Sequence, residues 1–300
     1  MSISSALVAA QQRVADAYTA ISNKGGTLPA TQNLSNMPTA INSIPSGGVG
    51  IPREVSAGGI YQMPTTSFTF SLPSNATDVG SYALYYAFYG CTGLTSIDLS
   101  SLSTVSGSYA LYYAFYGCTI LTSVDLSALT TVSGSVGLYY AFSDCTALTS
   151  VDLSALTTVS SSYAFYYAFS GCTALTSVDL SSLTTVSGTS GFSNAFYGCT
   201  GLTSVSFSAL STVSGNNGLS NVFKNCTGLT SVSFPALTTL SFGSYTNQFN
   251  NMMSNTGSTT THTLHFPSNL SSTISTLTGY PTFGGTSGYV TLAFDLPATS

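Results

Sequence analysis

Hydrophobic positions recur along most of this chain at a fixed spacing. In one copy of the pattern the apolar residues are Leu121, Val124, Leu126, Leu129 and Val132. Six cysteines mark the period, each 27 residues after the one before: Cys91, Cys118, Cys145, Cys172, Cys199 and Cys226. A constant period in this range is typical of solenoids, in which each unit buries its apolar side against its neighbours.

The spacing inside one unit predicts two kinds of local structure. Val124 and Leu126 alternate with polar residues, which favours a short strand with one buried face. Leu138, Phe142 and Cys145 are spaced four and three residues apart, as on one face of a helical turn. Stacked units therefore predict a repeat solenoid with a parallel sheet on one face and short helical or irregular turns on the other. The cysteines are predicted to form a column of small buried residues.

The pattern also predicts where the array begins and ends. Thr69–Leu72 aligns with Ser96–Leu99 after a shift of one period and reads as a divergent capping unit. Near residue 260 the period breaks. Residues 261–266 are predicted to form a last rung, and 288–294 a closing strand. We therefore divide the chain into an N-terminal segment, 1–52, a leucine-rich solenoid, 53–260, and a C-terminal β cap, 261–300.

The repeated apolar and cysteine positions also form a sequence motif. The motif Ala-Phe-x-x-Cys-x-x-Leu-x-x-Val/Ile-x-Leu recurs in the units from Ala87 to Ala195, for example as Ala114, Phe115, Cys118, Leu121, Val124 and Leu126. Phe207 takes the final Leu position in the last of these units, and Val222-Phe223 replaces Ala-Phe in the unit after it. In this respect residues 66–250 resemble the bacterial surface-protein (BspA-like) leucine-rich repeats. The resemblance implies adhesion or interaction modules and not catalysis.

The N-terminal segment has a different periodicity. Apolar residues at heptad spacing predict an amphipathic helix over residues 3–23: Ile3, Leu7, Ala10, Val14, Ala17 and Ile21. This helix either packs on its own chain or forms a coiled-coil stem that makes homo-oligomers or docks onto a partner. Residues 24–29 and 33–41, which follow it, are similar to the N-terminal segments of phage tail and minor structural proteins. That similarity implies attachment to virion tail proteins.

The composition argues against several classes of partner. Only 4% of the residues are charged and only four are basic, so a nucleic-acid partner is not expected. No apolar run is long enough for membrane insertion, and residues 3–21 lack the features of a secretory signal. No Lys or Arg lies between Arg53 and Lys224, so trypsin-like proteases have no site across most of the array.

No catalytic, cofactor or metal constellation is evident. His262 and His265 are three residues apart on a predicted strand and would face opposite sides, which makes a poor metal pair. We expect no enzyme activity and no cofactor.

Two outward columns are the candidate binding surface. One is acidic: Asp98, Asp125, Asp152 and Asp179. Carboxylates on adjacent rungs, about 4.8 Å apart, repel one another and need water, serine hydroxyl donors or cations nearby. The other column is aromatic: Tyr85, Tyr86, Tyr112, Tyr113, Tyr139, Tyr140, Tyr166 and Tyr167. Both columns change at the same unit, to Ser206 in the first and to Ser193 and Asn194 in the second.

Two interpretations of these columns stay open. They form the binding half of the array, where tyrosines give a large contact area at little entropic cost, or the early units are duplications that have not diverged. The leading prediction is a non-catalytic receptor-binding component of a phage tail that presents the solenoid to a host-surface glycan or protein. The alternative is a bacterial cell-surface adhesin, which would place the protein outside the cell.

Overall fold

The computed structural model describes residues 54–55, 61–62, 67–72, 74–240, 249, 251–254, 262–276 and 290–298. The chain divides into two compact units, residues 1–66 and 67–300. In the first unit the described structure is an antiparallel pair of strands, β1 (Glu54–Val55) and β2 (Tyr61–Gln62). The predicted helix over residues 3–23, its coiled coil and the phage-like segment lie outside the described residues.

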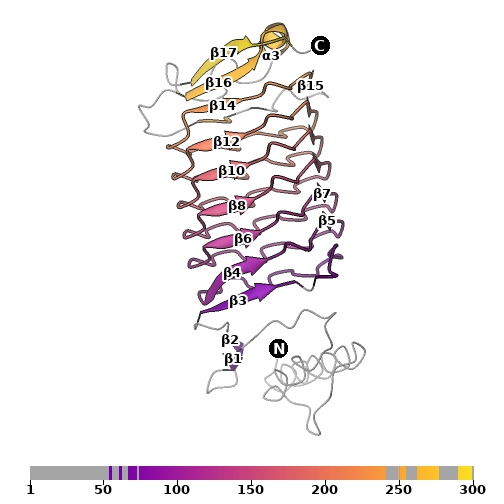
Figure 1. Ribbon diagram of the computed structural model, residues 1–300, viewed down its shortest axis with the longest axis vertical. Helices are drawn as coiled ribbons and strands as arrows, with labels where there is room; N and C mark the ends of the chain where they lie inside the picture. Colours follow the sequence, from indigo (N-terminus) through magenta and orange to yellow (C-terminus); the bar gives the residue numbers. More distant parts are fainter. Residues whose placement is uncertain are drawn as a thin grey trace, which may run out of the picture. The chain divides into compact units, whose positions relative to one another are not determined.

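The described residues between 67 and 240 form a solenoid whose coils, up to that of β12, each contribute one strand to a long parallel sheet (Figure 1). Its strands are β3 (Phe68–Ser71), β4 (Leu94–Asp98), β6 (Ser123–Asp125), β8 (Ser150–Asp152), β10 (Ser177–Asp179) and β12 (Ser204–Ser206). Neighbouring strands pair in register at the repeat period, as Val124 with Val151. The predicted first unit is confirmed, because Phe70 pairs with Ile97.

A second parallel sheet, which the sequence pattern did not predict, takes one strand from each coil from that of β4 onward. Its two-residue strands are β5 (Thr104–Val105), β7 (Thr131–Val132), β9 (Thr158–Val159), β11 (Thr185–Val186), β13 (Thr212–Val213) and β15 (Thr239–Leu240). The second residue of each strand is buried and is a valine, as Val132 is, except in β15, where it is Leu240. Threonines before these strands also donate their hydroxyls to the preceding coil, as Thr157 does to the Thr130 carbonyl at 3.1 Å.

The C-terminal end of the array is closed by a third sheet of three strands. It contains β14 (Ser231–Ser233), β16 (His262–Pro267) and β17 (Val290–Leu296). Leu264 pairs with Val232 and with Leu292, so the predicted last rung and closing strand are both confirmed. A short 3-10 turn, η1 (Ser268–Leu270), and a one-turn helix, α3 (Ser271–Ile274), follow β16.

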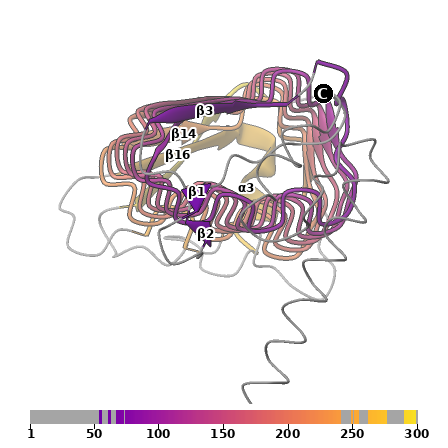
Figure 2. The same ribbon diagram turned by 90° about the horizontal axis from the view of Figure 1, so that it is seen from below.

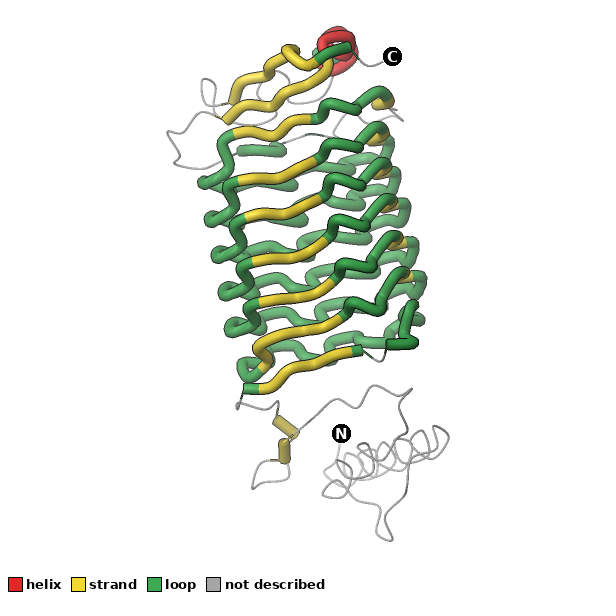
Figure 3. The backbone as a smooth tube through the Cα atoms, viewed as in Figure 1, coloured by secondary structure: helices red, strands yellow, loops and turns green. Residues whose placement is uncertain are grey.

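The predicted helix-like segment of each coil is instead a run of turns (Figure 3). The N–H of Leu138 donates to the Ala164 carbonyl of the next coil at 2.8 Å, and that of Ala141 donates to the Leu138 carbonyl at 3.0 Å. Every fourth residue has a positive φ, for example Tyr140 at 52° and Asp144 at 59°. This alternation buries the same positions that a helix would bury, which is why the spacing of Leu138, Phe142 and Cys145 suggested one.

The core consists of identical side chains stacked along the solenoid axis, where the coils superimpose (Figure 2). Phe115, Phe142 and Phe169 lie fully buried, with consecutive ring centroids 5.1 and 5.2 Å apart and nearly parallel planes. The predicted column of buried cysteines is confirmed. The Cys145 thiol donates to the Phe115 carbonyl at 3.2 Å, and burial raises its pKa. Among the described residues, no helix has the length and apolarity needed to span a bilayer.

Candidate binding surface

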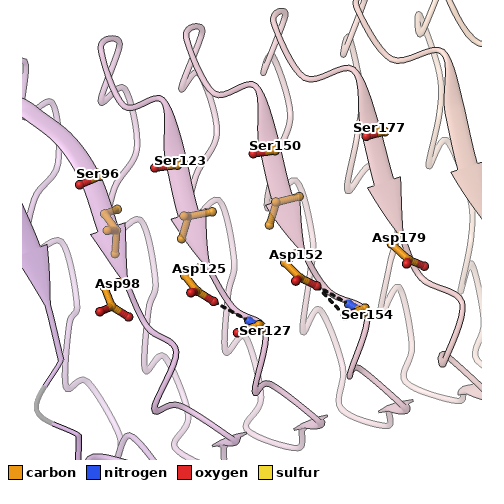
Figure 4. Close-up of a pocket in the computed structure, with 13 residues that line it drawn as sticks. Ser96, Asp98, Ser123, Asp125, Ser127, Ser150, Asp152, Ser154, Ser177 and Asp179 are labelled. Atoms are coloured by element: carbon orange, nitrogen blue, oxygen red, sulfur yellow. Dashed lines mark hydrogen bonds between the residues drawn. The ribbon is translucent and has the colours of Figure 1, made fainter.

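The predicted aspartate column lies on the outer face of the first sheet, on β4, β6, β8 and β10 (Figure 4). Each carboxylate accepts a hydrogen bond from the backbone N–H two residues further on, at 2.8–2.9 Å. Asp152 also accepts from the Ser154 hydroxyl at 2.7 Å, so a flanking serine supplies a donor there as expected. Hydrogen bonds from Ser154 lower the pKa of Asp152, and those from Ser100 lower the pKa of Asp98.

These aspartates have a local structural role in the turn that ends each strand. The hydrogen bond that the backbone N–H of residue i+2 donates to the carboxylate of residue i is that of an Asx turn, which satisfies a backbone donor at the strand end. Together with serines of the same strands they line an open groove of about 730 Å³. Among the described residues, no three metal-ligating side chains come together, in this groove or elsewhere. The groove therefore presents carboxylates and hydroxyls in repeated, equivalent positions.

The predicted tyrosines lie on the turn segments, on a surface that shares no lining residue with the aspartate groove. Two further columns, which sequence reasoning missed, widen it. We call this surface the tyrosine face: Tyr82, Tyr85, Tyr86, Tyr89, Tyr109, Tyr112, Tyr113, Tyr116, Tyr139, Tyr140, Tyr163, Tyr166 and Tyr167. The missed columns were visible as the spacing Tyr-x-x-Tyr-Tyr-x-x-Tyr, which is complete in the first two coils.

Tyrosines of neighbouring coils stack face to face. Tyr86 and Tyr113 have centroids 5.2 Å apart and planes at 3°, and Tyr113 and Tyr140 have centroids 4.8 Å apart, also at 3°. Tyr112 and Tyr139 stack at 5.0 Å with planes at 11°. Inside the stack each ring face is thus covered by another ring, and the surface offers ring edges and phenol hydroxyls.

The backbone under these tyrosines is strained. Tyrosines at every fourth position have a φ between 51° and 60°, in the left-handed region: Tyr82, Tyr86, Tyr109, Tyr113, Tyr140, Tyr163 and Tyr167. This region costs an L-residue about 1–2 kcal/mol, and asparagine tolerates it better. The later coils have Asn194 and Asn221 at equivalent positions, with φ 58° and 54°. The early coils therefore keep tyrosine where asparagine would relieve strain.

The tyrosine face ends where its positions become covered. In the next coil Ser193 and Asn194 are only 4% and 5% exposed, whereas Tyr85 and Tyr86, in the same two columns of the first coil, are 45% and 39% exposed. The Asn194 amide donates to the Ser193 hydroxyl at 2.8 Å. The change from tyrosine to small polar residues thus coincides with loss of solvent access in these two columns, and the tyrosine face spans residues 82–167 of the part of the chain that the structure describes.

High pH is expected to destabilise the solenoid through this face. A hydrogen bond to the Asp144 carboxylate, followed by burial, raises the pKa of Tyr116 to about 12, and burial raises the pKa of Tyr140. The folded state therefore holds these protons more tightly than the unfolded chain, whose tyrosine pKa is 10.0. The stabilisation is complete below pH 10.0 and is lost as the pH rises through the folded values. Thermal unfolding monitored by circular dichroism, with tyrosinate absorbance recorded alongside, measures this effect.

The two histidines face opposite sides of β16, as predicted. His262 is buried, and its Nδ1 lies 2.6 Å from the Leu229 carbonyl oxygen. His265 is partly exposed, and its Nδ1 lies 2.9 Å from the Asp295 carboxylate. This contact lowers the pKa of Asp295. His262 thus has a partner in the segment before β14, and His265 has one in β17.

Comparison with known proteins identifies the repeat. A family model described as the BspA type leucine-rich repeat region matches residues 61–167 and 166–272, well over half of the chain. A solved structure of a leucine-rich cell surface protein from Faecalibacterium prausnitzii A2-165 is similar at 16% identity, covering 72% of this chain and 86% of that chain, with a TM-score of 0.23. No curated protein sequence matches. The chain belongs to the BspA type leucine-rich repeat family.

Proposed function

We propose that this protein is a non-catalytic adhesin of the bacterial cell surface that holds its ligand on the tyrosine face. The observation that carries the proposal is the stack of partly exposed tyrosines on strained backbone. Residues held in strained backbone conformations cluster at ligand-binding sites, which supports a binding role for these tyrosines. The family match favours this alternative over the phage tail component, which it does not support.

The chemistry of the tyrosine face favours a protein ligand. Glycans bind aromatic side chains chiefly by lying on a ring face, and the inner rings cover one another's faces. What remains exposed is a broad surface of ring edges and hydroxyls, the chemistry that antibody loops use against proteins. Tyrosine hydroxyls are protonated at physiological pH and can donate hydrogen bonds there, and burial raises the pKa of Tyr113 and Tyr140 further above the usual 10.0.

An exposed location agrees with the composition. Between Arg53 and Lys224 there is no Lys or Arg, so trypsin-like proteases cannot cut most of the array. The remaining polar surface consists of hydroxyls and amides, many of them already hydrogen-bonded between coils, as Thr122 is to the Thr95 carbonyl. Such a surface suits a protease-rich environment outside the cell.

Replacing the two inner tyrosine columns by the residues of the later coils is expected to abolish adhesion. Tyr85, Tyr112, Tyr139 and Tyr166 become Ser, and Tyr86, Tyr113, Tyr140 and Tyr167 become Asn. The fold is expected to persist, because Ser193 and Asn194 occupy equivalent positions on the same backbone conformation. The full chain on beads is tested against fibronectin, laminin, collagen, mucin and a glycan array. We expect binding to a protein of this panel that weakens at least about tenfold in the variant.

A matched control changes the acidic column. Asp98, Asp125, Asp152 and Asp179 are replaced by Ser, the residue that stands at 206 and 233 in later coils. This variant is expected to bind like the native chain. The proposal fails if the native chain binds no protein of the panel, if the tyrosine variant binds equally well, or if the aspartate variant loses binding instead.

A further inference from the structure

One tyrosine column of the tyrosine face has a missing ring. Tyr82 and Tyr109 stack in adjacent coils, with centroids 5.2 Å apart and planes at 4°. The next coil has Val136 at this position, and the coil after it has Tyr163. The valine leaves a hollow of about 350 Å³ between the two tyrosines. Its lining is aromatic apart from Val136: Tyr109, Tyr112, Tyr139, Tyr163 and Tyr166.

The width of this hollow suits one planar ring. Tyr109 and Tyr163 are two coils apart, or about 9.6 Å at the usual spacing of parallel strands. A ring midway between them would lie about 4.8 Å from each, within the range preferred by stacked aromatic pairs. In the neighbouring column the same coil supplies such a ring: Tyr139 lies 5.0 Å from Tyr112 and 5.1 Å from Tyr166.

The strained backbone at Val136 is a second, independent observation that points to the hollow. Its φ is 60°, and a β-branched residue in the left-handed region is a genuine outlier. Tyr109, Tyr163 and Asn217 occupy the same position in other coils with φ of 57°, 56° and 55°. Val136 thus leaves the hollow open at the cost of backbone strain, although better-tolerated residues occur at equivalent positions. Strain of this kind clusters at ligand sites.

We propose that the hollow between Tyr109 and Tyr163 is a binding site for a phenolic ring, which completes the tyrosine column by stacking on both walls. The ring comes from a small phenol or from a tyrosine side chain of a bound protein. Its hydroxyl emerges beside those of Tyr112, Tyr139 and Tyr166, where it exchanges hydrogen bonds with them or with water. The site is independent of where the protein resides and of the adhesion proposal.

Calorimetric titration of the full chain with p-cresol tests the site. We expect saturable binding with one site per chain, and no comparable binding of 4-methylcyclohexanol, which carries the same groups on a non-planar ring. Val136→Tyr fills the hollow with the residue found at 109 and 163 and is expected to weaken binding at least about tenfold, because it removes both stacking contacts. A blocked Gly-Tyr-Gly peptide forms a second arm. If the peptide also binds, the site accepts tyrosine side chains of a bound protein. If only p-cresol binds, the natural ligand is a small free phenol.

Two control variants keep this test falsifiable. Asn217→Tyr adds a tyrosine at the equivalent position of a later coil and is expected to leave p-cresol binding unchanged. Val136→Asn relieves the strain but leaves the hollow open, so it is expected to raise the melting temperature and retain binding. The proposal is overturned if p-cresol shows no saturable binding, if Val136→Tyr binds it as well as the native chain does, or if 4-methylcyclohexanol binds equally. Since none of these measurements involves an adhesion ligand, failure here and failure of the adhesion proposal are distinguishable.

Discussion

Phe142→Ala is expected to lower the free energy of unfolding by about 3–5 kcal/mol, the usual cost of deleting a buried phenylalanine side chain. Phe142 is fully buried and stacks on Phe115 on one side and on Phe169 on the other, at 5.1 and 5.2 Å. The cavity cannot collapse easily, because the backbones on both sides are held at fixed spacing by hydrogen bonds between coils, such as that from Phe142 to the Ala168 carbonyl. Urea unfolding monitored by circular dichroism measures the loss.

A matched exposed position gives the control for this substitution. Tyr89 also belongs to an aromatic column of the turn segment and stacks on Tyr116 at 5.0 Å, but it is 47% exposed. Tyr89→Ala is expected to cost less than about 1 kcal/mol, because little apolar area returns to water. Equal losses for the two variants would contradict the division into a buried phenylalanine core and a solvent-facing tyrosine surface.

The repeat made the inward half of each coil predictable. A period of 27 residues with leucine, valine and cysteine at constant positions allows one stacked arrangement, and side chains such as Leu126 and Cys145 are fully buried as expected. The divergent first unit and the last rung also followed from this alignment. These features were predictable because adjacent coils carry the same apolar positions, which fixes the register of their strands: a shift of one residue would turn every inward side chain outward.

The turn segment could not be predicted because two conformations bury the same positions. A helix and a run of turns with every fourth residue left-handed both place Leu138, Phe142 and Cys145 on one side. The decisive contacts are hydrogen bonds to the next coil, as from Leu138 to the Ala164 carbonyl, and these are invisible in a local pattern. The two-residue strands such as β7 are likewise defined only by their neighbours.

The candidate surface was predictable in part. The 27-residue period was enough to predict the two inner tyrosine columns. The orientation of their rings was not predictable from the sequence, and this orientation is what covers the ring faces. The aspartates stood out as a column, although their hydrogen bonds give each a role in its own turn. The hollow at Val136 could not be predicted from the sequence. A single valine in a column of tyrosines is also what random substitution would produce, and only the structure shows that its φ is positive.

Removing one whole coil is expected to harm the fold less than removing about half a coil. Deletion of residues 200–226 joins Cys199 to Thr227, and because residues 200–207 and 227–234 are identical, the junction reproduces the native sequence. Every later side chain then keeps its column. Deletion of residues 200–213 removes β12 and β13, so the turn segment after Ser214 directly follows Cys199. That coil then lacks its two strands, and its neighbours lose their hydrogen-bond partners.

Thermal unfolding of these two deletion variants tests most directly the central claim that the 27-residue coil is the unit of this fold. The whole-coil deletion is predicted to unfold cooperatively, with a melting temperature within about 10 °C of the native chain, because each coil contacts only its neighbours. The shorter deletion is predicted to lose its cooperative transition. A half-coil variant as stable as the whole-coil variant, or a whole-coil variant that does not fold, would contradict the claim.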